Sequence, residues 1–597
     1  LSQFVTQLAS NERQAAVLSF DHKFTERMAA FGDFMYANTK TFSQLNGQPF
    51  SASVAASDPT NPFNVAVTAR NRYFAFPRTY FNDTTFIRGV AGVRGDVGEN
   101  WHWEVAADYN RIGQDFLNGG LIDSAARAAA VSGHIINLFA RVQSPTAIAD
   151  SGMLGSALGI AESKLTTYDA KIYGKLFTLP AGDLSIALGA EHRIETYSQN
   201  ADRSSQSATF AWDSGTTLDP FDGSRKVDSV YSEVRFPVVK DIPGLHFVEL
   251  SAAVRHESYS DTENPTVPKF SLRWLPFNDE FAVSAAYGKS FTAPTLFQLF
   301  GPGGIGYSTS LQLVGTDGSP IVGQSLVSSG SNPRLKPSKA DNYSVQLVYS
   351  PKAIKGLKAG VNYSHVKQVD LVSSLDAATI LDDVEFNGPA SPYAQYVHIG
   401  GFNGTPITAK GQIHSNAIDN IYVQTTLINL AKQEYGAYGA DIEYTMPTDN
   451  MGKFTFAAKA LVWDKYAVTF LPTSDPYETA GKVTTTNGTL PRYQGTLISS
   501  WTLRSWGADV AMQYWPAVTD DNDGTRIPAI AQFDVAATYT FGSRNAWANG
   551  LKVRVGANNV FNKLAPLDPG TFTDSNADTA TYGAIGRLIF IEASYKF

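Results

Sequence analysis

Apolar and polar residues alternate strictly along much of this chain, in segments of roughly ten residues. Trp101, Trp103 and Val105, for example, interleave with His102 and Glu104. Successive side chains of a β-strand point to opposite faces, so each segment predicts a strand with one apolar and one hydrated face. Because about ten residues suffice for a tilted strand to cross a bilayer, this spacing is typical of a transmembrane barrel.

The same alternation assigns individual side chains to the two faces of the predicted barrel wall. In a membrane barrel the apolar set meets lipid and the polar set lines the lumen. We therefore predict that Leu184, Ile186, Leu188 and Val345 face lipid, and that Asp183, Glu191 and Gln346 face the lumen.

A soluble β-sandwich alternates in the same way, because its inner faces are apolar and its outer faces are polar. Three features favour the barrel. Aromatic residues stand at the ends of the apolar faces, where a transmembrane barrel has its interfacial girdles. The predicted connections alternate between very short and very long. The chain also ends in an alternating series that closes on an aromatic residue: Ile589, Ile591, Ala593, Tyr595 and Phe597.

Marking strands by alternation gives about nineteen antiparallel strands, the last of them over residues 582–597. Short connections at 97–99, 180–182 and 276–279 are rich in turn-forming residues and are predicted to be periplasmic. The long connections are mostly polar, Gly-rich or aromatic, and are predicted to be extracellular: residues 43–83, 114–167, 292–340 and 373–433. The predicted fold class is therefore all-β, a transmembrane antiparallel β-barrel domain over residues 1–597.

The composition excludes several other classes of protein. Charged residues make up 17% of the chain, below the roughly 25% usual for soluble domains, and aromatic residues reach 12%. A net charge of −8, without a long run of Lys or Arg, argues against a nucleic-acid surface. The chain has no Cys, which excludes thiol chemistry, Cys-type zinc sites and iron–sulfur clusters. No stretch approaches the roughly 18 uninterrupted apolar residues of a membrane-spanning helix.

Groupings that could carry catalysis or bind a metal are weak. The nine His residues form no HExxH motif and no close pair at metal-ligand spacing. Residues 520–524, Asp-Asp-Asn-Asp-Gly, have the carboxylate density of a calcium loop, but Ala531 stands where an EF-hand closes with Glu. We therefore predict no catalytic residue, no metal site and no cofactor, and a protein that is not an enzyme.

Three segments of the sequence and its terminal residue point to a known family. Residues 292–300 read Thr-Ala-Pro-Thr-Leu-Phe-Gln-Leu-Phe, residues 332–343 include Asn-Pro-Arg-Leu-Lys-Pro, and residues 556–563 read Gly-Ala-Asn-Asn-Val-Phe-Asn-Lys. With the terminal Phe597, these segments closely resemble the barrel of TonB-dependent outer-membrane receptors. Residues 61–63 and 179–182, with 189–191, look like the larger members of that family.

The resemblance implies a 22-stranded barrel in the outer membrane of a Gram-negative bacterium, plugged by an N-terminal domain. It implies active uptake of a scarce nutrient with energy delivered by TonB and its inner-membrane motor. Counting back from a final strand numbered 22, the first strand of this chain would be number 4. We therefore expect the plug, the TonB-contacting segment and the first strands upstream of Leu1. Other implied partners are outer-membrane lipid, lipopolysaccharide and a surface lipoprotein.

Other functions remain open at this point. A passive outer-membrane porin is the main alternative, although sixteen to eighteen strands already suffice for an aqueous channel. An outer-membrane hydrolase and a soluble β-rich binding protein are further possibilities. Within the receptor family, iron chelates, cobalamin, oligosaccharides and peptides are all substrates, and the sequence does not choose among them.

The predicted substrate-binding residues lie on two neighbouring extracellular loops. Aromatic side chains give large contact areas at low entropic cost, and exposed groups of them often mark recognition surfaces. The alternative is that some of these rings pack the loops against each other. The candidates on the first loop are Phe297, Gln298, Phe300 and Tyr307, and those on the second are Tyr393, Tyr396, His398 and Tyr422.

Overall fold

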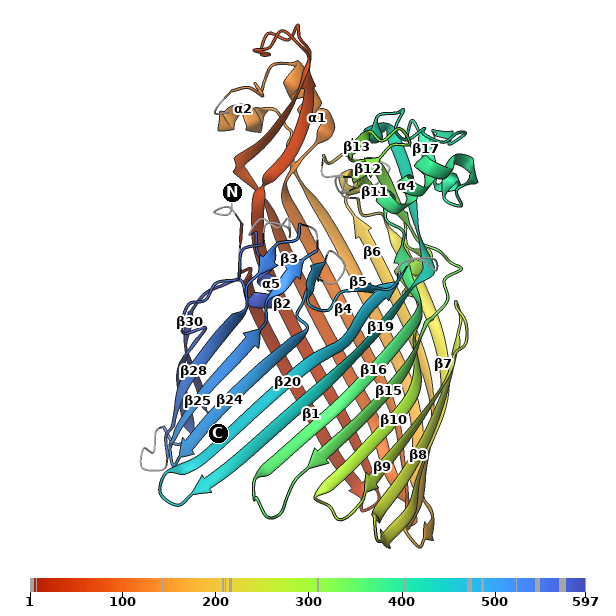
Figure 1. Cartoon of the computed structure of the whole chain (residues 1–597), viewed down its shortest axis with the longest axis vertical. Coiled ribbons are helices and arrows are strands. Elements are labelled where there is room, and N and C mark those ends of the chain that lie inside the picture. Colours follow the sequence, from red (N-terminus) through yellow and green to blue (C-terminus); the bar gives the residue numbers. More distant parts are fainter. Residues whose placement is uncertain are drawn as a thin grey trace.

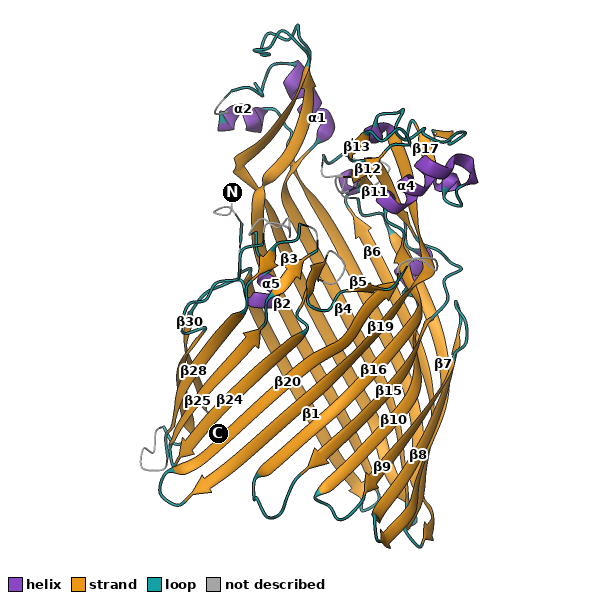
Figure 2. Cartoon of the chain, in the orientation of Figure 1, coloured by secondary structure: helices purple, strands orange, loops and turns teal. Residues whose placement is uncertain are grey.

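The computed structural model describes the chain except for residues 1–4, 7, 141–143, 207–208, 210, 214–216, 309–310, 402–403, 470–474, 485–487, 522, 543–547, 569–575 and 596–597. Long, tilted antiparallel strands form a tall wall that curves around a central axis, and most helices lie beyond one end of it (Figures 1 and 2). No helix among the described residues is long and apolar enough to span a membrane.

Nineteen strands form the continuous antiparallel ladder of this wall, as the alternation predicts. Each pairs with the next along the chain, so the order in space is the order in sequence. Among the described residues, β1 pairs only with β2 and β30 only with β29, which leaves one edge on each of them. The ladder comprises β1 (Ser10–Thr25), β2 (Met28–Val54), β3 (Val67–Val97), β4 (Trp101–Ile122), β5 (Leu154–Leu179), β6 (Gly182–Ala201), β7 (Phe221–Ile242), β8 (Leu245–Tyr259), β9 (Thr266–Leu275), β10 (Phe281–Thr292), β15 (Ser338–Tyr349), β16 (Leu357–Ser374), β19 (Ile421–Thr448), β20 (Gly452–Thr469), β24 (Tyr493–Leu503), β25 (Trp506–Trp515), β28 (Ile530–Thr540), β29 (Leu551–Asn558) and β30 (Leu588–Tyr595).

Short turns close the strand pairs at one end of the wall. β3 and β4 are joined by residues 98–100, where Gly98 adopts φ +64°, a left-handed conformation that Gly reaches without strain. Gly244 does the same between β7 and β8, with φ +78°. These turns lie at the bottom of Figure 1 and match the predicted periplasmic side.

Long connections lie at the opposite end, but several are shorter than predicted because the strands continue past the apolar segment. β2 and β3 remain paired from Ser43 opposite Tyr80 up to Val54 opposite Val67, so most of residues 43–83 is a hairpin. β19 likewise begins at Ile421 and not near residue 433. Outside a bilayer a strand needs backbone partners but no apolar outer face, so the alternation signal ends before the strand does. The last strand also begins at Leu588, because Tyr582 lies in a helix.

Smaller elements build the long connections. Two short sheets stand apart from the wall, one of β12 and β13 and the other of β22, β23, β26 and β27. The remaining elements are α1 (Ser124–Ser132), α2 (Pro145–Asp150), η2 (Arg203–Ser205), α3 (Leu296–Phe300), β11 (Gly304–Tyr307), β12 (Leu311–Val314), β13 (Pro320–Gly323), β14 (Leu326–Gly330), α4 (Ala377–Asn387), η3 (Gly388–Ala390), η4 (Ala394–Tyr396), β17 (Val397–Ile399), β18 (Thr405–Pro406), η5 (Ile418–Asn420), β21 (Tyr477–Glu478), β22 (Lys482–Thr484), β23 (Gly488–Leu490), β26 (Val518–Asp520), β27 (Arg526–Ile527) and α5 (Thr579–Tyr582).

The outer face of the wall carries aromatic side chains at two levels, with aliphatic residues between them. At the upper level, Tyr287 and Tyr343 have ring centroids 4.9 Å apart, and Tyr363 and Tyr438 are 4.6 Å apart. At the lower level, Trp506 contacts Tyr539 at 4.7 Å. These levels match the interfacial girdles of a membrane barrel. Leu188 and Val345 are exposed on the outer face between them, as predicted.

Candidate functional site

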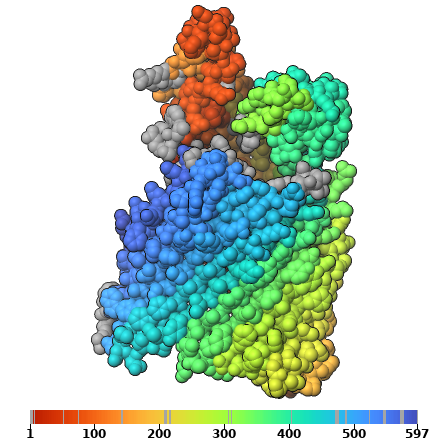
Figure 3. All heavy atoms as spheres, in the orientation of Figure 1, coloured from red at the N-terminus to blue at the C-terminus, as the bar shows by residue number. Residues whose placement is uncertain are grey.

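Two lobes rise from the extracellular end (Figures 1 and 3). Each lobe has its own buried core. The first lobe combines the outer part of the β2–β3 hairpin with residues 123–153, which contain α1 and α2. Its core includes Phe50, Ile122, Ile136 and Met153. The second lobe combines residues 293–337 with residues 375–420. The long connections therefore fold into compact units above the wall.

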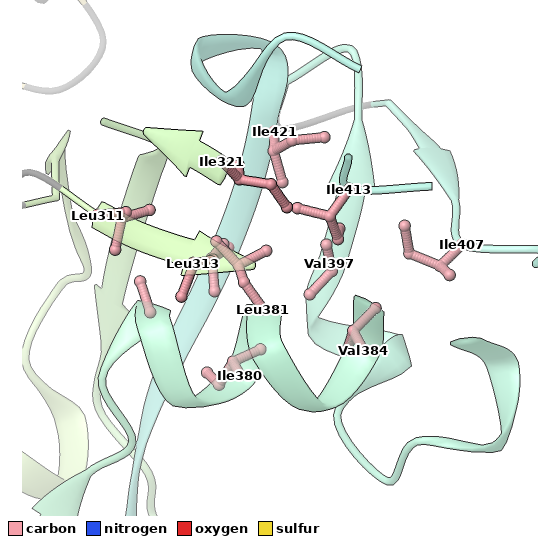
Figure 4. Packing of buried hydrophobic residues seen from close by; sticks show 12 residues of the cluster. Leu311, Leu313, Ile321, Ile380, Leu381, Val384, Val397, Ile407, Ile413 and Ile421 are labelled. Atoms are coloured by element: carbon pink, nitrogen blue, oxygen red, sulfur yellow. The ribbon is translucent and has the colours of Figure 1, made fainter. Parts of the chain in front are cut away.

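The core of the second lobe takes side chains from both of its connections (Figure 4). Leu311 and Ile321 come from the first connection, and Leu381 and Ile413 come from the second. α4 supplies its apolar face to this core, and Asp376 caps its N-terminus by accepting a hydrogen bond from the Thr379 backbone N–H at 2.8 Å. The two connections thus form one folded unit.

A buried carboxylate also joins the two connections. The Glu385 side chain is 0% exposed and accepts hydrogen bonds from the backbone N–H groups of Thr316 at 3.0 Å, Ile413 at 3.0 Å and His414 at 3.2 Å. Burial of a charge is costly unless hydrogen bonds replace its water, and these donors do so. Thr316 belongs to the first connection and the other two to the second, so the carboxylate fixes their relative position.

A parallel strand pairing locks the same two connections to the wall. β14 runs beside the extracellular end of β19, with Leu326 opposite Tyr422 and Gly330 opposite Thr426. The Thr425 hydroxyl adds a hydrogen bond to the Ser328 carbonyl oxygen at 3.1 Å. The second lobe is therefore an extension of β19 and not a separate domain on a hinge.

The structure places Phe297, Gln298 and Phe300 in α3, and Tyr307 at the end of β11 opposite Leu326. Gln298 completes a capping box with Thr295: its backbone N–H donates to the Thr295 hydroxyl at 3.1 Å, and its side-chain oxygen accepts from the Thr295 N–H at 2.9 Å. Gln298 therefore shapes the helix. Phe297, Phe300 and Tyr307 are exposed, Phe297 to 42% and Tyr307 to 56%.

Phe297 is brought together with two rings that the sequence alone did not single out. Its ring meets Phe221 edge-on at 5.9 Å and Tyr197 edge-on at 6.4 Å, and those two rings are 6.0 Å apart. Tyr197 and Phe221 lie on the lumen-facing sides of β6 and β7. The resulting aromatic cluster, Tyr197, Phe221 and Phe297, stands at the extracellular mouth of the lumen.

The second-loop candidates are largely packed into the second lobe. Tyr422 is 2% exposed and hydrogen-bonds to the Ser328 hydroxyl. The His398 ring lies 6.1 Å from the Tyr422 ring, on the neighbouring strand β17. Tyr393 packs against the core, and Tyr396 is half-buried at the end of η4. The structure thus brings these four together with one another but not with α3.

Arg225 is a further residue that the sequence analysis missed. It is 4% exposed, its Nε donates to both carboxylate oxygens of Asp261 at 2.9 Å, and its guanidinium donates to the Pro294 carbonyl oxygen at 2.6 Å. It also lies 5.3 Å from the Tyr259 ring centroid, in cation–π geometry. Pro294 stands two residues before α3, so Arg225 fixes the start of that helix to the barrel wall.

Arg225 adjoins a network of ion pairs on the inner wall. Arg193 donates to Glu191 at 3.1 Å and to Glu195 at 2.7 Å, while Arg255 reaches Glu191 at 3.1 Å. The predicted inward position of Glu191 is consistent with these contacts. Because each of these arginines is paired with carboxylates, the network positions the wall and presents little free charge.

An enclosed cavity of about 150 Å³ lies near the aromatic cluster, between β3, β4, β5 and the β6–β7 connection. Arg78, Tyr80, Asn118 and Trp212 are among its lining residues. Ala201 also lines it and shares a face of β6 with Tyr197, about 13 Å away at strand spacing. None of the three residues of the aromatic cluster lines this cavity, so the two are neighbouring candidate sites at the mouth. Within the described residues, no group of three His, Asp or Glu could hold a metal ion.

A tall antiparallel barrel with aromatic girdles, short turns at one end and ordered lobes at the other defines the class of outer-membrane receptor barrels. The sequence comparison agrees: residues 30–560 match the TonB dependent receptor-like, beta-barrel family, and the chain belongs to that family. Its members are outer-membrane receptors of Gram-negative bacteria that take up small nutrients and interact with TonB. Among curated proteins, none matches the sequence.

Solved structures show the same fold. The ferric enterobactin receptor PfeA of Pseudomonas aeruginosa, in complex with enterobactin, superposes with a TM-score of 0.51 at 12% identity, over 98% of this chain and 81% of that one. The siderophore receptor PirA of Acinetobacter baumannii gives 0.55 at 12% identity, over 99% and 81%. FpvA of P. aeruginosa, bound to pyoverdine and iron, gives 0.57 at 12% identity, over 99% and 66%. At such identities the likeness concerns the fold.

Proposed function

We propose that this protein is a TonB-dependent outer-membrane receptor that binds an iron chelate at its extracellular mouth and imports it into the periplasm. The observation that carries the proposal is the aromatic cluster of Tyr197, Phe221 and Phe297 at the mouth. The cavity lined by Arg78 is a second feature of the same mouth, about 13 Å along β6 from Tyr197. Aromatic faces and a guanidinium group favour a flat, anionic ligand, which describes the metal-binding groups of many iron chelates. The names of the structural neighbours, which are siderophore receptors, support the same substrate class.

Active import also requires parts that complete the barrel and couple it to energy. The unpaired edges of β1 and β30 would each cost free energy in hydrocarbon, where backbone groups find no water. Within the described residues, these edges support the proposal that further strands complete the barrel. The proposed plug and TonB-contacting segment rest on the family alone. Outer-membrane lipid, lipopolysaccharide and a surface lipoprotein are the other partners we propose.

The test is a binding screen with the full-length protein purified from outer membranes. Intrinsic Trp fluorescence would be titrated with a ferric catecholate, a ferric hydroxamate, cobalamin and a maltooligosaccharide. We expect saturable quenching by one class of ferric chelate and none by the metal-free chelator at equal concentration. Saturable binding of cobalamin or the oligosaccharide alone would show that the proposed substrate class is wrong.

A passive porin is the competing function. Single-channel recording with the same protein separates the two, because a receptor with a plug passes little current and a porin shows a steady open conductance. An open channel that binds none of the four probes would overturn the receptor proposal.

A further inference from the structure

Arg78 presents its guanidinium group to the cavity of about 150 Å³ at the mouth, here called the Arg78 cavity. The Nε atom donates a hydrogen bond to the backbone carbonyl oxygen of Asn46 at 3.0 Å. Within the described part of the chain, no other hydrogen bond and no ion pair reaches this side chain. Its terminal N–H groups therefore have no acceptor there.

Arg88 shows how the same strand accommodates a cation elsewhere. An even number of residues separates it from Arg78 on β3, so the two side chains share a face. Arg88 lies 3.4 Å from a carboxylate oxygen of Asp108 on the neighbouring strand β4. A partly buried charge is costly unless a counter-charge or hydrogen bonds replace its water. Arg78 lacks the counter-charge that Arg88 has.

Two further polar side chains of the cavity wall offer hydrogen-bond donors. Tyr80 lies two residues from Arg78 and pairs in register with Asn118 on β4, so all three side chains point to one face. Both Tyr80 and Asn118 line the Arg78 cavity. Their hydroxyl and amide groups form no hydrogen bond with any other described residue. The three side chains together form one set of donors.

The carboxylates close to the cavity are already engaged. Among the described residues that line it, none is Asp or Glu. Asp202 accepts hydrogen bonds from the backbone N–H of Leu158 at 2.7 Å and from the hydroxyl of Ser205 at 2.9 Å, and both of those residues line the cavity. Asp213 pairs with Arg127 at 2.5 Å. The cavity therefore holds a positive charge that no acid in the described wall neutralises.

The size of the cavity and its apolar walls restrict the ligand further. A volume of about 150 Å³ corresponds to about five water molecules, and a cavity of this size takes a molecule as large as benzene. Phe116 from β4 and Trp212 from the β6–β7 connection both line it. Trp212 is 7% exposed and its indole N–H donates to the Ser205 hydroxyl at 3.0 Å, so this ring is held in place. A whole iron chelate does not fit, and an inorganic anion would leave the apolar walls unfilled.

A planar carboxylic acid combines the required charge and shape. In its ionised form the carboxylate matches the fork of a guanidinium group, which donates two parallel hydrogen bonds to it. An aromatic ring attached to that carboxylate packs against the aromatic side chains of the wall, and such ring pairs add to the free energy of burial.

We propose that the Arg78 cavity binds one small planar monocarboxylate, with the carboxylate on the guanidinium group and the ring against Phe116 and Trp212. The carboxylate belongs either to a free acid or to one arm of a larger molecule, and the chemistry of recognition is the same. The proposal does not rest on the proposed function, because it follows from the groups that line the cavity.

Isothermal titration calorimetry of the full-length protein, purified from outer membranes, tests the site with three probes. Benzoate has both the charge and the ring, benzamide has the same shape without the charge, and phosphate has the charge without the ring. We expect benzoate to bind at one site and at least about tenfold more tightly than either of the other probes. Absence of benzoate binding, equal binding of benzamide, or tighter binding of phosphate would each overturn the proposal.

Three variants locate the site. Arg78→Gln should lower benzoate affinity at least about tenfold and leave benzamide binding unchanged. Ala157→Leu, at a lining residue that is 9% exposed, should weaken binding of both probes because the larger side chain fills the cavity. Arg88→Gln is the matched control and should leave both affinities unchanged. If it lowers benzoate affinity as much as Arg78→Gln does, the field of the inner wall attracts the anion and the proposed site is wrong.

The two cavity variants change different properties, charge and volume. If one of them fails to insert into the outer membrane, the other still tests the site.

Competition separates the two sources of the carboxylate. Benzoate would be titrated into the protein saturated with the ferric chelate that the binding screen identifies. Displacement of benzoate would show that an arm of the imported molecule uses the cavity, and simultaneous binding would show that a separate small acid does. If benzoate binds while no chelate does, the proposed function fails and this site stands.

Discussion

The guanidinium group of Arg225 donates a hydrogen bond to the carbonyl oxygen of Pro294 across 2.6 Å, although 69 residues separate them in the chain. This contact joins the inner wall of the barrel to the first turn of the connection that carries Phe297. An exposed ring can act as a ligand contact only if its backbone is held in place. Arg225 is therefore a positioning residue for the aromatic cluster.

The first prediction concerns this contact. Arg225→Met keeps most of the side-chain volume but leaves Asp261 buried without its partner, which costs about 3–5 kcal/mol in comparable sites. We expect α3 to shift and affinity for the ferric chelate to fall by at least about tenfold, with the barrel still inserted. Arg235→Met is the control, since Arg235 also pairs with a carboxylate, Glu249, but is exposed. Equal affinity in both variants would contradict the positioning role.

The second prediction concerns the aromatic cluster. Phe297→Ala removes the ring that meets Tyr197 and Phe221, and we expect chelate affinity to fall by about tenfold or more, as for a central contact residue. Tyr396→Ala, in the second lobe and away from α3, should change affinity much less. Fluorescence titration of both variants, with surface expression measured in parallel, checks this. A larger effect at Tyr396 would place the site in the second lobe.

The third prediction concerns Glu385. Glu385→Ala leaves three backbone N–H groups without their acceptor, and hydrogen bonds to charged groups contribute about 1.5–3 kcal/mol each. We expect residues 375–420 to become sensitive to protease and to exchange amide hydrogen faster. Asp382→Ala, on an exposed position of the same helix, is the matched control. Unchanged protection in Glu385→Ala would show that the apolar core alone holds the lobe together.

The fourth prediction is a pH dependence. Hydrogen bonds from the Ser319 side chain and backbone, with a smaller effect of His414, lower the pKa of Asp317 below its usual value of 3.8. When the pKa of a carboxyl group is lower in the folded than in the unfolded state, its ionisation stabilises the fold at pH values above the unfolded-state pKa. That stabilisation is lost as the pH falls through the folded-state pKa. The Asp317–His414 contact, 3.0 Å between Oδ2 and Nε2, should therefore persist at pH 5 and weaken only below about pH 4.

Hydrogen exchange of residues 405–420 as a function of pH measures this transition. Ser319→Ala removes the main cause of the lowered pKa, so the loss of protection should begin at higher pH than in the wild type. An identical pH profile in the variant would rule out Asp317 as the titrating group.

The fifth prediction concerns the faces of the wall. The chain has no native Cys, so single Cys variants can be labelled without background. Leu184→Cys should resist a membrane-impermeant, water-soluble reagent, and Asp183→Cys should react once the lumen is accessible. Equal reactivity of the two positions would contradict the assignment of outer and inner faces.

The sequence predicted the wall well and the loops poorly, for a physical reason. Lipid imposes a strict two-residue period on every strand that crosses it, so strand number and turn positions could be read directly. Above the membrane no such constraint acts, so the alternation did not indicate the hairpin beyond Ser43 or the pairing of β14 with β19. Tyr422 shows the same limit, because an aromatic residue in a loop gives no sign of whether it meets a ligand or a core. Arg225 was overlooked because the alternation predicts a strand only from Val227, whereas β7 begins at Phe221.

The shared core of the second lobe determines how its loops can be transferred onto another barrel. Leu311 and Leu381 share a core, and Glu385 accepts hydrogen bonds from Thr316 and from Ile413. A graft of residues 293–337 alone onto another barrel would carry only three of the twelve buried residues of that core, Leu311, Leu313 and Ile321. Residues 293–337 and 375–420 grafted together, with the β19 extension they pair to, carry every one of these contacts. The two connections therefore form one folded unit that has to be transferred as a pair, so chimeric receptors should be cut at paired boundaries.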